Sequence, residues 1–76
     1  MEYEKVRAII AEQLHIPVEE ISAATAFIED LGMDSIEILQ LILKIEKEFD
    51  IELNDLRPEM MFTVGDAVNY ISQIIR

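Results

Sequence analysis

Cysteine is absent from this 76-residue chain, and histidine occurs once, as His15. Without cysteine the chain has no disulfide, no thiolate metal site and no cysteine nucleophile, so any thiol chemistry must come from a cofactor. His15 is expected at the end of the first helix, where a solvated residue is commoner than a catalytic base. We therefore expect no catalytic triad.

Basic residues are scarce, with six Lys and Arg against sixteen Asp and Glu, which gives a formal net charge of −10. Such a surface repels the phosphate backbone of nucleic acids and anionic lipid headgroups, so we expect no nucleic-acid partner. A protein with a basic patch would instead be steered toward the chain. The charge alone is equally compatible with a role in solubility.

Long apolar runs are also missing, since none approaches the ~18 residues that cross a bilayer. The first five residues, MEYEK, lack the basic and then apolar pattern of a signal peptide. The sequence therefore predicts a soluble, cytoplasmic protein without membrane insertion.

The short length predicts a single domain over residues 1–76. A domain of this size buries only about 60% of the surface that its unfolded chain exposes. The hydrophobic fraction of 51% suffices for one compact core. Little volume is left for a walled active site, which argues against an enzyme.

Between Tyr3 and Leu14, apolar residues recur at three- and four-residue steps, which predicts a first helix. Pro17 disfavours helical backbone at the residue before it, so this helix should end near His15. Residues 16–33 then follow neither a helical nor a strand period. We expect an ordered loop held to the core by four apolar residues, Ile21, Phe27, Ile28 and Leu31.

The second helix has the clearest start signal in the sequence. Asp34 as N-cap and Glu37 three residues later form an acidic capping box. Gly32 permits a sharp turn just before them, because glycine tolerates backbone angles that other residues avoid. This helix should run to about Phe49.

The C-terminal third contains Pro58, which leaves room for at most a short helical turn. Thr63 should begin a last helix, with Asp66 completing its cap. The pattern therefore predicts an all-α fold, a small four-helix bundle of three main helices and a short third helix. A long ordered loop joins the first and second helices.

The second helix carries two separate apolar stripes. One would pack on the first and last helices and comprises Ile38, Leu41, Ile42, Ile45 and Phe49. The other, formed by Ile36, Leu39 and Leu43, points away from it. Exposed apolar residues rimmed by charge are typical of a protein interface. The alternative is that a neighbouring loop covers this second stripe.

Ser35 is the first residue inside the second helix. A phosphate ester on its hydroxyl would lie beside unpaired backbone N–H groups at the positive end of the helix dipole. Asp34 and Glu37 place carboxylates nearby, where a modifying enzyme would hold magnesium during phosphoryl transfer. A simple capping role for Asp34 or Ser35 is the alternative. The spacing fails the calcium-loop template, because Leu41 stands where a glutamate is needed, and we expect no metal site.

Residues 29–36, EDLGMDSI, resemble the Asp-Ser-Leu signature region of acyl carrier proteins. The likeness extends over the whole chain, through the acidic second helix to the closing helix that begins TV. Ile36 replaces the commoner leucine. Gln40, Lys44 and Lys47 interrupt a face that is often more uniformly acidic, and residues 53–61 also depart from the family pattern.

The resemblance implies that a phosphopantetheinyl transferase converts Ser35, with coenzyme A, into a 4'-phosphopantetheine ester, with Asp34 beside it in the cofactor site. The thiol at the end of the arm would carry acyl groups as thioesters in fatty acid or polyketide-type biosynthesis. The chain would then be a carrier and not an enzyme.

The resemblance also implies that the helix after the serine is the docking surface for partner proteins. The candidate contact residues are Ile36, Glu37, Leu39, Leu43, Glu46 and Glu48. The expected partners are the transferase and acyl-transferring and synthase enzymes with basic patches, and we expect the chain to be a monomer. An aminoacyl or peptidyl carrier and an unmodified helical interaction domain are the alternatives.

Overall fold

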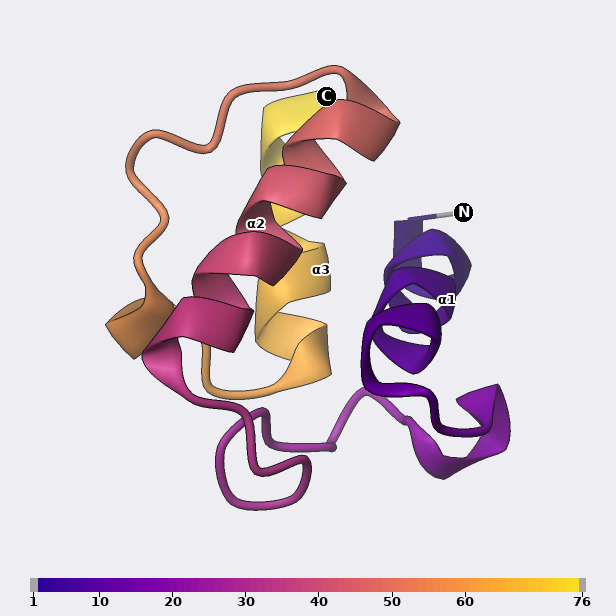
Figure 1. Cartoon of the computed structure of the whole chain (residues 1–76). Coiled ribbons are helices and arrows are strands. Elements are labelled where there is room, and N and C mark those ends of the chain that lie inside the picture. The colour runs from indigo at the N-terminus through magenta and orange to yellow at the C-terminus, as the bar shows by residue number, and fades with distance from the viewer. Residues whose placement is uncertain (1, 76) are drawn as a thin grey trace.

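A computed structural model describes residues 2–75, and the all-α prediction is confirmed (Figure 1). Within those residues the only β pairing is an isolated bridge between Ala26 and Thr63. The helices are α1 (Glu2–Leu14), α2 (Ser35–Phe49) and α3 (Val64–Ile75), with single 3-10 turns η1 (Val18–Glu20) and η2 (Pro58–Met60). The predicted short third helix is the turn η2, and η1 was not predicted.

Helix α1 packs against both α2 and α3, and α2 also contacts η2. In Figure 1 the long loop from α1 passes beneath the helices before it reaches the start of α2. No helix within residues 2–75 is long and apolar enough to cross a membrane.

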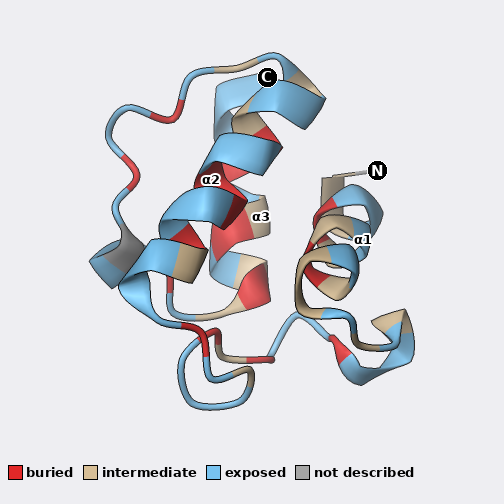
Figure 2. Cartoon of the chain, viewed as in Figure 1, coloured by how far each residue is buried: buried red, intermediate tan, exposed pale blue. Residues whose placement is uncertain are grey.

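The core is one cluster to which every helix contributes a buried stripe (Figure 2). Val6 and Ile10 are buried on α1, and Val64, Ala67 and Ile71 on α3. The predicted inner stripe of α2 is buried at Ile38, Leu41, Ile42 and Ile45, with Phe49 packed partly buried against them.

Local signals set the helix ends where the sequence predicts them. Helix α1 stops at Leu14, and His15 follows with a left-handed φ of 58°. Helix α3 is preceded by a capping box, in which the Asp66 N–H donates to Thr63 Oγ1 and the Thr63 N–H donates to Asp66 Oδ2, both at 3.1 Å. These two bonds satisfy N–H groups at the start of α3 that have no partner within the helix.

The long loop is ordered, but not all of its apolar residues are held in the core. Ile21 and Phe27 are buried and Leu31 is partly buried, as predicted. Ile28 is 60% exposed, which corrects the prediction that it anchors the loop. The loop turns at Gly32, which has a φ of 66°, and this conformation favours glycine.

Candidate functional site

Ser35 is exposed and is the first residue of α2. The predicted capping box forms immediately around it, because the Glu37 N–H donates to Asp34 Oδ1 at 2.8 Å and the Asp34 N–H donates to Glu37 Oε1 at 3.1 Å. The N–H groups of Ser35 and Ile36 have no acceptor within the helix, since they precede its first hydrogen-bonded turn. The serine hydroxyl is therefore accessible at the positive end of a well-fixed helix.

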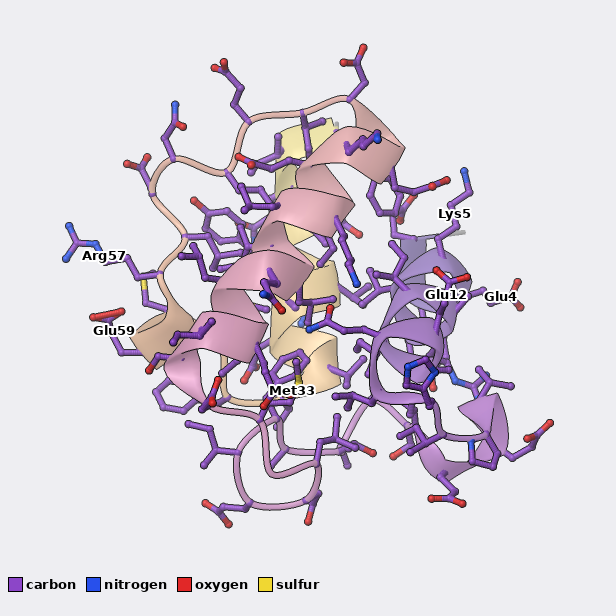
Figure 3. The ribbon with its side chains drawn as sticks, viewed as in Figure 1. Glu4, Lys5, Glu12, Met33, Arg57 and Glu59 are labelled. Carbon is purple, nitrogen blue, oxygen red and sulfur yellow. The ribbon has the colours of Figure 1, made fainter. Side chains whose placement is uncertain are left out.

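Ser35 lines a surface cavity of about 380 Å³. Its other lining residues come from the long loop, from α2 and from η2, and they are Ile28, Ile38 and Glu59. Figure 3 shows Glu59 projecting from η2 near the first turn of α2. Sequence reasoning missed Ile28 and Glu59 as neighbours of the serine. The course of the loops brings these two residues close to Ser35, and no sequence pattern predicts that course.

Three acidic residues are neighbours of the serine, either in the chain or in its cavity. The carboxylates of Asp34 and Glu37 are both used in the capping box, whereas Glu59 contributes from across the cavity. A phosphate ester at Ser35 would be stabilised by the helix N-terminus and opposed by these carboxylates. The exposed hydroxyl and the open cavity fit such a group. No cluster of His, Cys, Asp or Glu among residues 2–75 is suited to hold a metal ion.

The outer stripe of α2 is open to solvent, as one of the two sequence interpretations requires. Ile36 is 69% exposed, Leu39 50% and Leu43 56%. The alternative that a neighbouring loop covers the stripe is therefore wrong. Three large apolar side chains on one face of a helix form a surface suited to protein contact.

The three glutamates grouped with this stripe in the sequence analysis lie in different surroundings. Glu37 belongs to the capping box, and Glu46 Oε2 accepts a hydrogen bond of 2.7 Å from the Leu53 N–H. Glu48 is exposed but lines a separate cleft between α1 and α2. The other residues of that cleft are Ile9, Glu12, Lys44 and Lys47. Glu37 thus has the capping role that the sequence predicts, whereas Glu46 has a structural role that the sequence did not reveal.

Among the described residues that line the serine cavity, none is a histidine, a cysteine or a lysine. His15 is exposed, and it follows the last residue of α1. A nucleophilic serine needs a base within hydrogen-bond reach. The described side chains around Ser35 offer only carboxylates, so the geometry suits a serine that is modified by another protein.

Known proteins share the sequence and the fold of this chain. A family model described as a phosphopantetheine attachment site matches residues 4–71. An acyl carrier protein of Clostridium acetobutylicum is 52% identical over 71 residues, which cover 93% of this chain and 92% of that protein. An acyl carrier protein of a Sulfurovum species is 36% identical over 72 residues, covering 95% and 96%.

A solved structure of a candidate acyl carrier protein from Mycobacterium tuberculosis shares the fold with a TM-score of 0.86. Its sequence is 32% identical, and the match covers 96% of this chain and 97% of that one. The resemblance seen in residues 29–36 is thus confirmed over nearly the whole chain. The chain belongs to the acyl carrier protein family, whose members are not enzymes but carriers of acyl intermediates on covalent 4'-phosphopantetheine.

Proposed function

We propose that Ser35 carries the 4'-phosphopantetheine arm and that the whole of residues 1–76 acts as one cytoplasmic, monomeric carrier domain. The observation that carries this assignment is the position of Ser35, which is the exposed first residue of α2 at the mouth of an open cavity. When bound, the arm supplies a terminal thiol on which acyl groups are held as thioesters.

The attachment step uses the Ser35 hydroxyl as nucleophile. A bond forms between Ser35 Oγ and the phosphorus nearest the pantetheine in coenzyme A, and the bond from that phosphorus to the bridging oxygen of the diphosphate breaks. The adenosine bisphosphate leaves, and the serine proton passes to a base of the phosphopantetheinyl transferase. We assign that base to the partner, and His15, the chain's own histidine, does not line the serine cavity.

The chain's own residues fix and present the serine. The capping box holds the first turn of α2, and Gln13 Nε2 donates a hydrogen bond of 2.9 Å to the Glu37 carbonyl, which ties that turn to α1. Ser35 therefore has a defined position relative to the outer stripe formed by Ile36, Leu39 and Leu43. A transferase or synthase enzyme that docks on this stripe reaches the serine from the same side of the molecule.

Intact-protein mass spectrometry tests the assignment. The chain is incubated with coenzyme A, magnesium and a broad-specificity phosphopantetheinyl transferase, beside Ser35→Ala and Ser22→Ala. Ser22 is the matched control, because it is also exposed but lies in the long loop. We expect one added phosphopantetheine group in the wild type and in Ser22→Ala, and none in Ser35→Ala.

Ser35→Ala should fold normally, with a loss of at most about 1 kcal/mol at a helix start. Circular dichroism of the same samples checks that point. Loading of folded Ser35→Ala would refute the site. Absence of loading in every sample would favour a helical interaction domain that uses the outer stripe of α2 without modification.

A further inference from the structure

The cleft between α1 and α2, of about 400 Å³, contains two of the few cations of this acidic chain, Lys44 and Lys47. Only six residues of the whole chain are Lys or Arg. The other lining residues of the cleft are Ile9, Glu12 and Glu48. Two positive and two negative side chains leave the cleft without net charge, whereas the chain as a whole carries −10.

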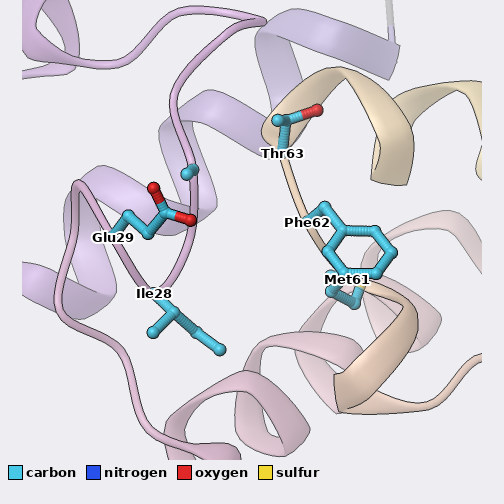
Figure 4. Close-up of a pocket in the computed structure, with 6 residues that line it drawn as sticks. Ile28, Glu29, Met61, Phe62 and Thr63 are labelled. Atoms are coloured by element: carbon cyan, nitrogen blue, oxygen red, sulfur yellow. The ribbon is translucent and has the colours of Figure 1, made fainter.

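The two other hollows of the surface are acidic. The serine cavity contains Glu59. A cleft of about 440 Å³ between the long loop and the segment that leads into α3 contains Glu29, beside the exposed side chains of Ile28 and Phe62 (Figure 4). Among the described residues that line these three hollows, lysine occurs only between α1 and α2. A carboxylate on a partner protein is therefore repelled at the first two hollows and not at the third.

Lys44 and Lys47 are free to bind a partner, unlike two other cations of the chain. Arg7 is hydrogen-bonded to the long loop, and Lys5 lies over an aromatic ring of α2. Lys44 and Lys47 are both exposed, and within residues 2–75 neither forms an ion pair or a side-chain hydrogen bond, although two glutamates line the same cleft. Their amines therefore lose no protein partner when another carboxylate approaches.

The two lysines extend the outer stripe of α2 away from Ser35. Lys47 lies four residues after Leu43, on the same face of the helix, and Lys44 follows Leu43 on the side of α1. A helix rises ~1.5 Å per residue, so the two lysines lie about 14 and 18 Å from Ser35 along the axis. The carboxylates of the capping box stand at the serine end. The docking face thus changes sign along its length, from acidic at Ser35 to basic near the end of α2.

A free anion gains little in this cleft. The N–H groups in the middle of α2 are used within the helix, so the cleft lacks the backbone donors that hold phosphate at a helix start. The net charge of −10 also repels a mobile anion. A carboxylate on a protein that already docks on the outer stripe is instead held at high local concentration by that docking. Partly buried Ile9 offers apolar surface to the methylene groups of such a side chain.

We propose that the partner enzyme of this chain presents an Asp or Glu side chain to the cleft between α1 and α2, where Lys44 and Lys47 bind it. The proposal rests on the function assigned to Ser35 and deepens it, because it defines the kind of partner. The docking surface of that partner is basic where it meets Ser35 and acidic about 14–18 Å away. An enzyme with basic residues at both places is repelled by the lysines, which makes them specificity-determining residues.

Zero-length crosslinking with a carbodiimide is the first test, because this reagent joins an amine to a carboxylate only where the two are in contact. The chain is mixed with a synthase enzyme purified from the organism that encodes it, and crosslinked peptides are identified by mass spectrometry. We expect an amide between Lys44 or Lys47 and an Asp or Glu of the enzyme. The variant with both Lys44→Arg and Lys47→Arg is the matched control, since arginine keeps the charge but does not form this amide.

Two results of the crosslinking contradict the proposal. One is that the lysines are joined only to Glu12 or Glu48 of the chain itself. The other is that they form no crosslink in a mixture in which other residues of the chain are joined to the enzyme.

The second test measures kcat/KM for acyl transfer from the loaded chain to the same enzyme. Lys47→Glu should lower kcat/KM by about tenfold, because two like charges then face each other in the interface. Lys47→Arg should retain the wild-type value. Arg57→Glu is the control, since it changes the net charge equally but lies beside η2, across α2 from Glu12 of α1 (Figure 3). It should alter kcat/KM by less than about twofold.

These outcomes separate the possible failures. If no phosphopantetheine is added to Ser35, the proposed function and the assignment of the partner both fall. If the loaded chain transfers its acyl group equally well as wild type and as Lys47→Glu, only the assignment of the partner falls. A rise of kcat/KM in Lys47→Glu is the result that a uniformly basic partner surface produces, and it also overturns that assignment.

Discussion

Arg7 Nε donates a hydrogen bond of 2.9 Å to the Ile21 carbonyl, and its Nη2 donates one of 2.7 Å to the Val18 carbonyl. One side chain of α1 thereby holds η1 and the start of the long loop. Arg7→Met should lower the free energy of unfolding by about 2 kcal/mol, because hydrogen bonds to charged groups are worth ~1.5–3 kcal/mol. Urea denaturation measures the change.

The control for Arg7 is Lys5→Met, which removes the same charge from the same helix. Lys5 lies 5.6 Å from the centre of the Phe49 ring, a contact worth about 0.5–1 kcal/mol at an exposed site. Equal losses of unfolding free energy in the two variants would show that the change in net charge explains the effect of Arg7→Met. The hydrogen bonds from Arg7 to the loop would then not be its cause.

Glu46 and Glu48 are two glutamates of α2 of which only Glu46 has a structural hydrogen bond, so their alanine variants can be compared directly. Glu46→Ala should destabilise the chain by about 1–3 kcal/mol, because it leaves the Leu53 N–H without its acceptor. Glu48→Ala removes the same charge from an exposed site and should change stability by less than about 0.5 kcal/mol. Thermal unfolding of both variants measures the difference. If the two variants are equally stable, the hydrogen bond from the Leu53 N–H to Glu46 does not contribute to the stability of the chain.

Asp34→Asn separates the cap from the charge beside Ser35. Asparagine is as good an N-cap as aspartate, so stability should change by less than about 0.5 kcal/mol. The rate of arm attachment should fall by about tenfold, the equivalent of one charged hydrogen bond to the transferase or its magnesium. Asp66→Asn, at the start of α3, is the control with the same charge change. An unchanged rate in Asp34→Asn would remove Asp34 from the proposed site.

A polar substitution in the outer stripe of α2 should weaken docking of the transferase without lowering the stability of the chain. Leu43 is 56% exposed, so Leu43→Ser should alter the free energy of unfolding by less than about 0.5 kcal/mol. Truncating a central interface residue costs more than ~1 kcal/mol, and kcat/KM for arm attachment should therefore fall about tenfold. Ile74→Ser, on α3, should leave kcat/KM unchanged. A wild-type value for Leu43→Ser would exclude this residue from the transferase interface.

The sequence predicted those features whose signals are local. The capping box of Asp34 and Glu37 needs only a three-residue spacing, and it fixed both the start of α2 and the position of Ser35. The two stripes of α2 follow from helical periodicity, so the buried Ile38 and the exposed Leu43 were separated correctly.

Features that depend on the path of a loop were not predictable in this way. Ile28 was expected in the core, but the loop turns it outward between two hollows. The approach of Glu59 to Ser35 and the bond from Leu53 to Glu46 join residues that no periodic pattern connects. Such contacts are set by tertiary packing, which overrides local preference.

The net charge of −10 makes the stability of this small molecule depend on ionic strength. Its principal extents are 28 × 24 × 19 Å. At ~0.01 M salt the Debye length of about 30 Å exceeds every one of these extents, so all carboxylates repel one another, whereas at ~0.15 M it is about 8 Å and only near neighbours interact. The free energy of unfolding should therefore rise between these concentrations, by on the order of 1 kcal/mol.

Urea denaturation in NaCl and in KCl measures this salt effect, since screening does not distinguish the two cations. The same increase in salt should slow arm attachment, because it weakens the attraction between the acidic chain and a basic transferase surface. Opposite signs for stability and association rate are the signature of a charged surface that opposes folding and favours docking. Stability that is independent of salt would show that the carboxylates are too far apart, or too well solvated, to repel one another in the folded chain.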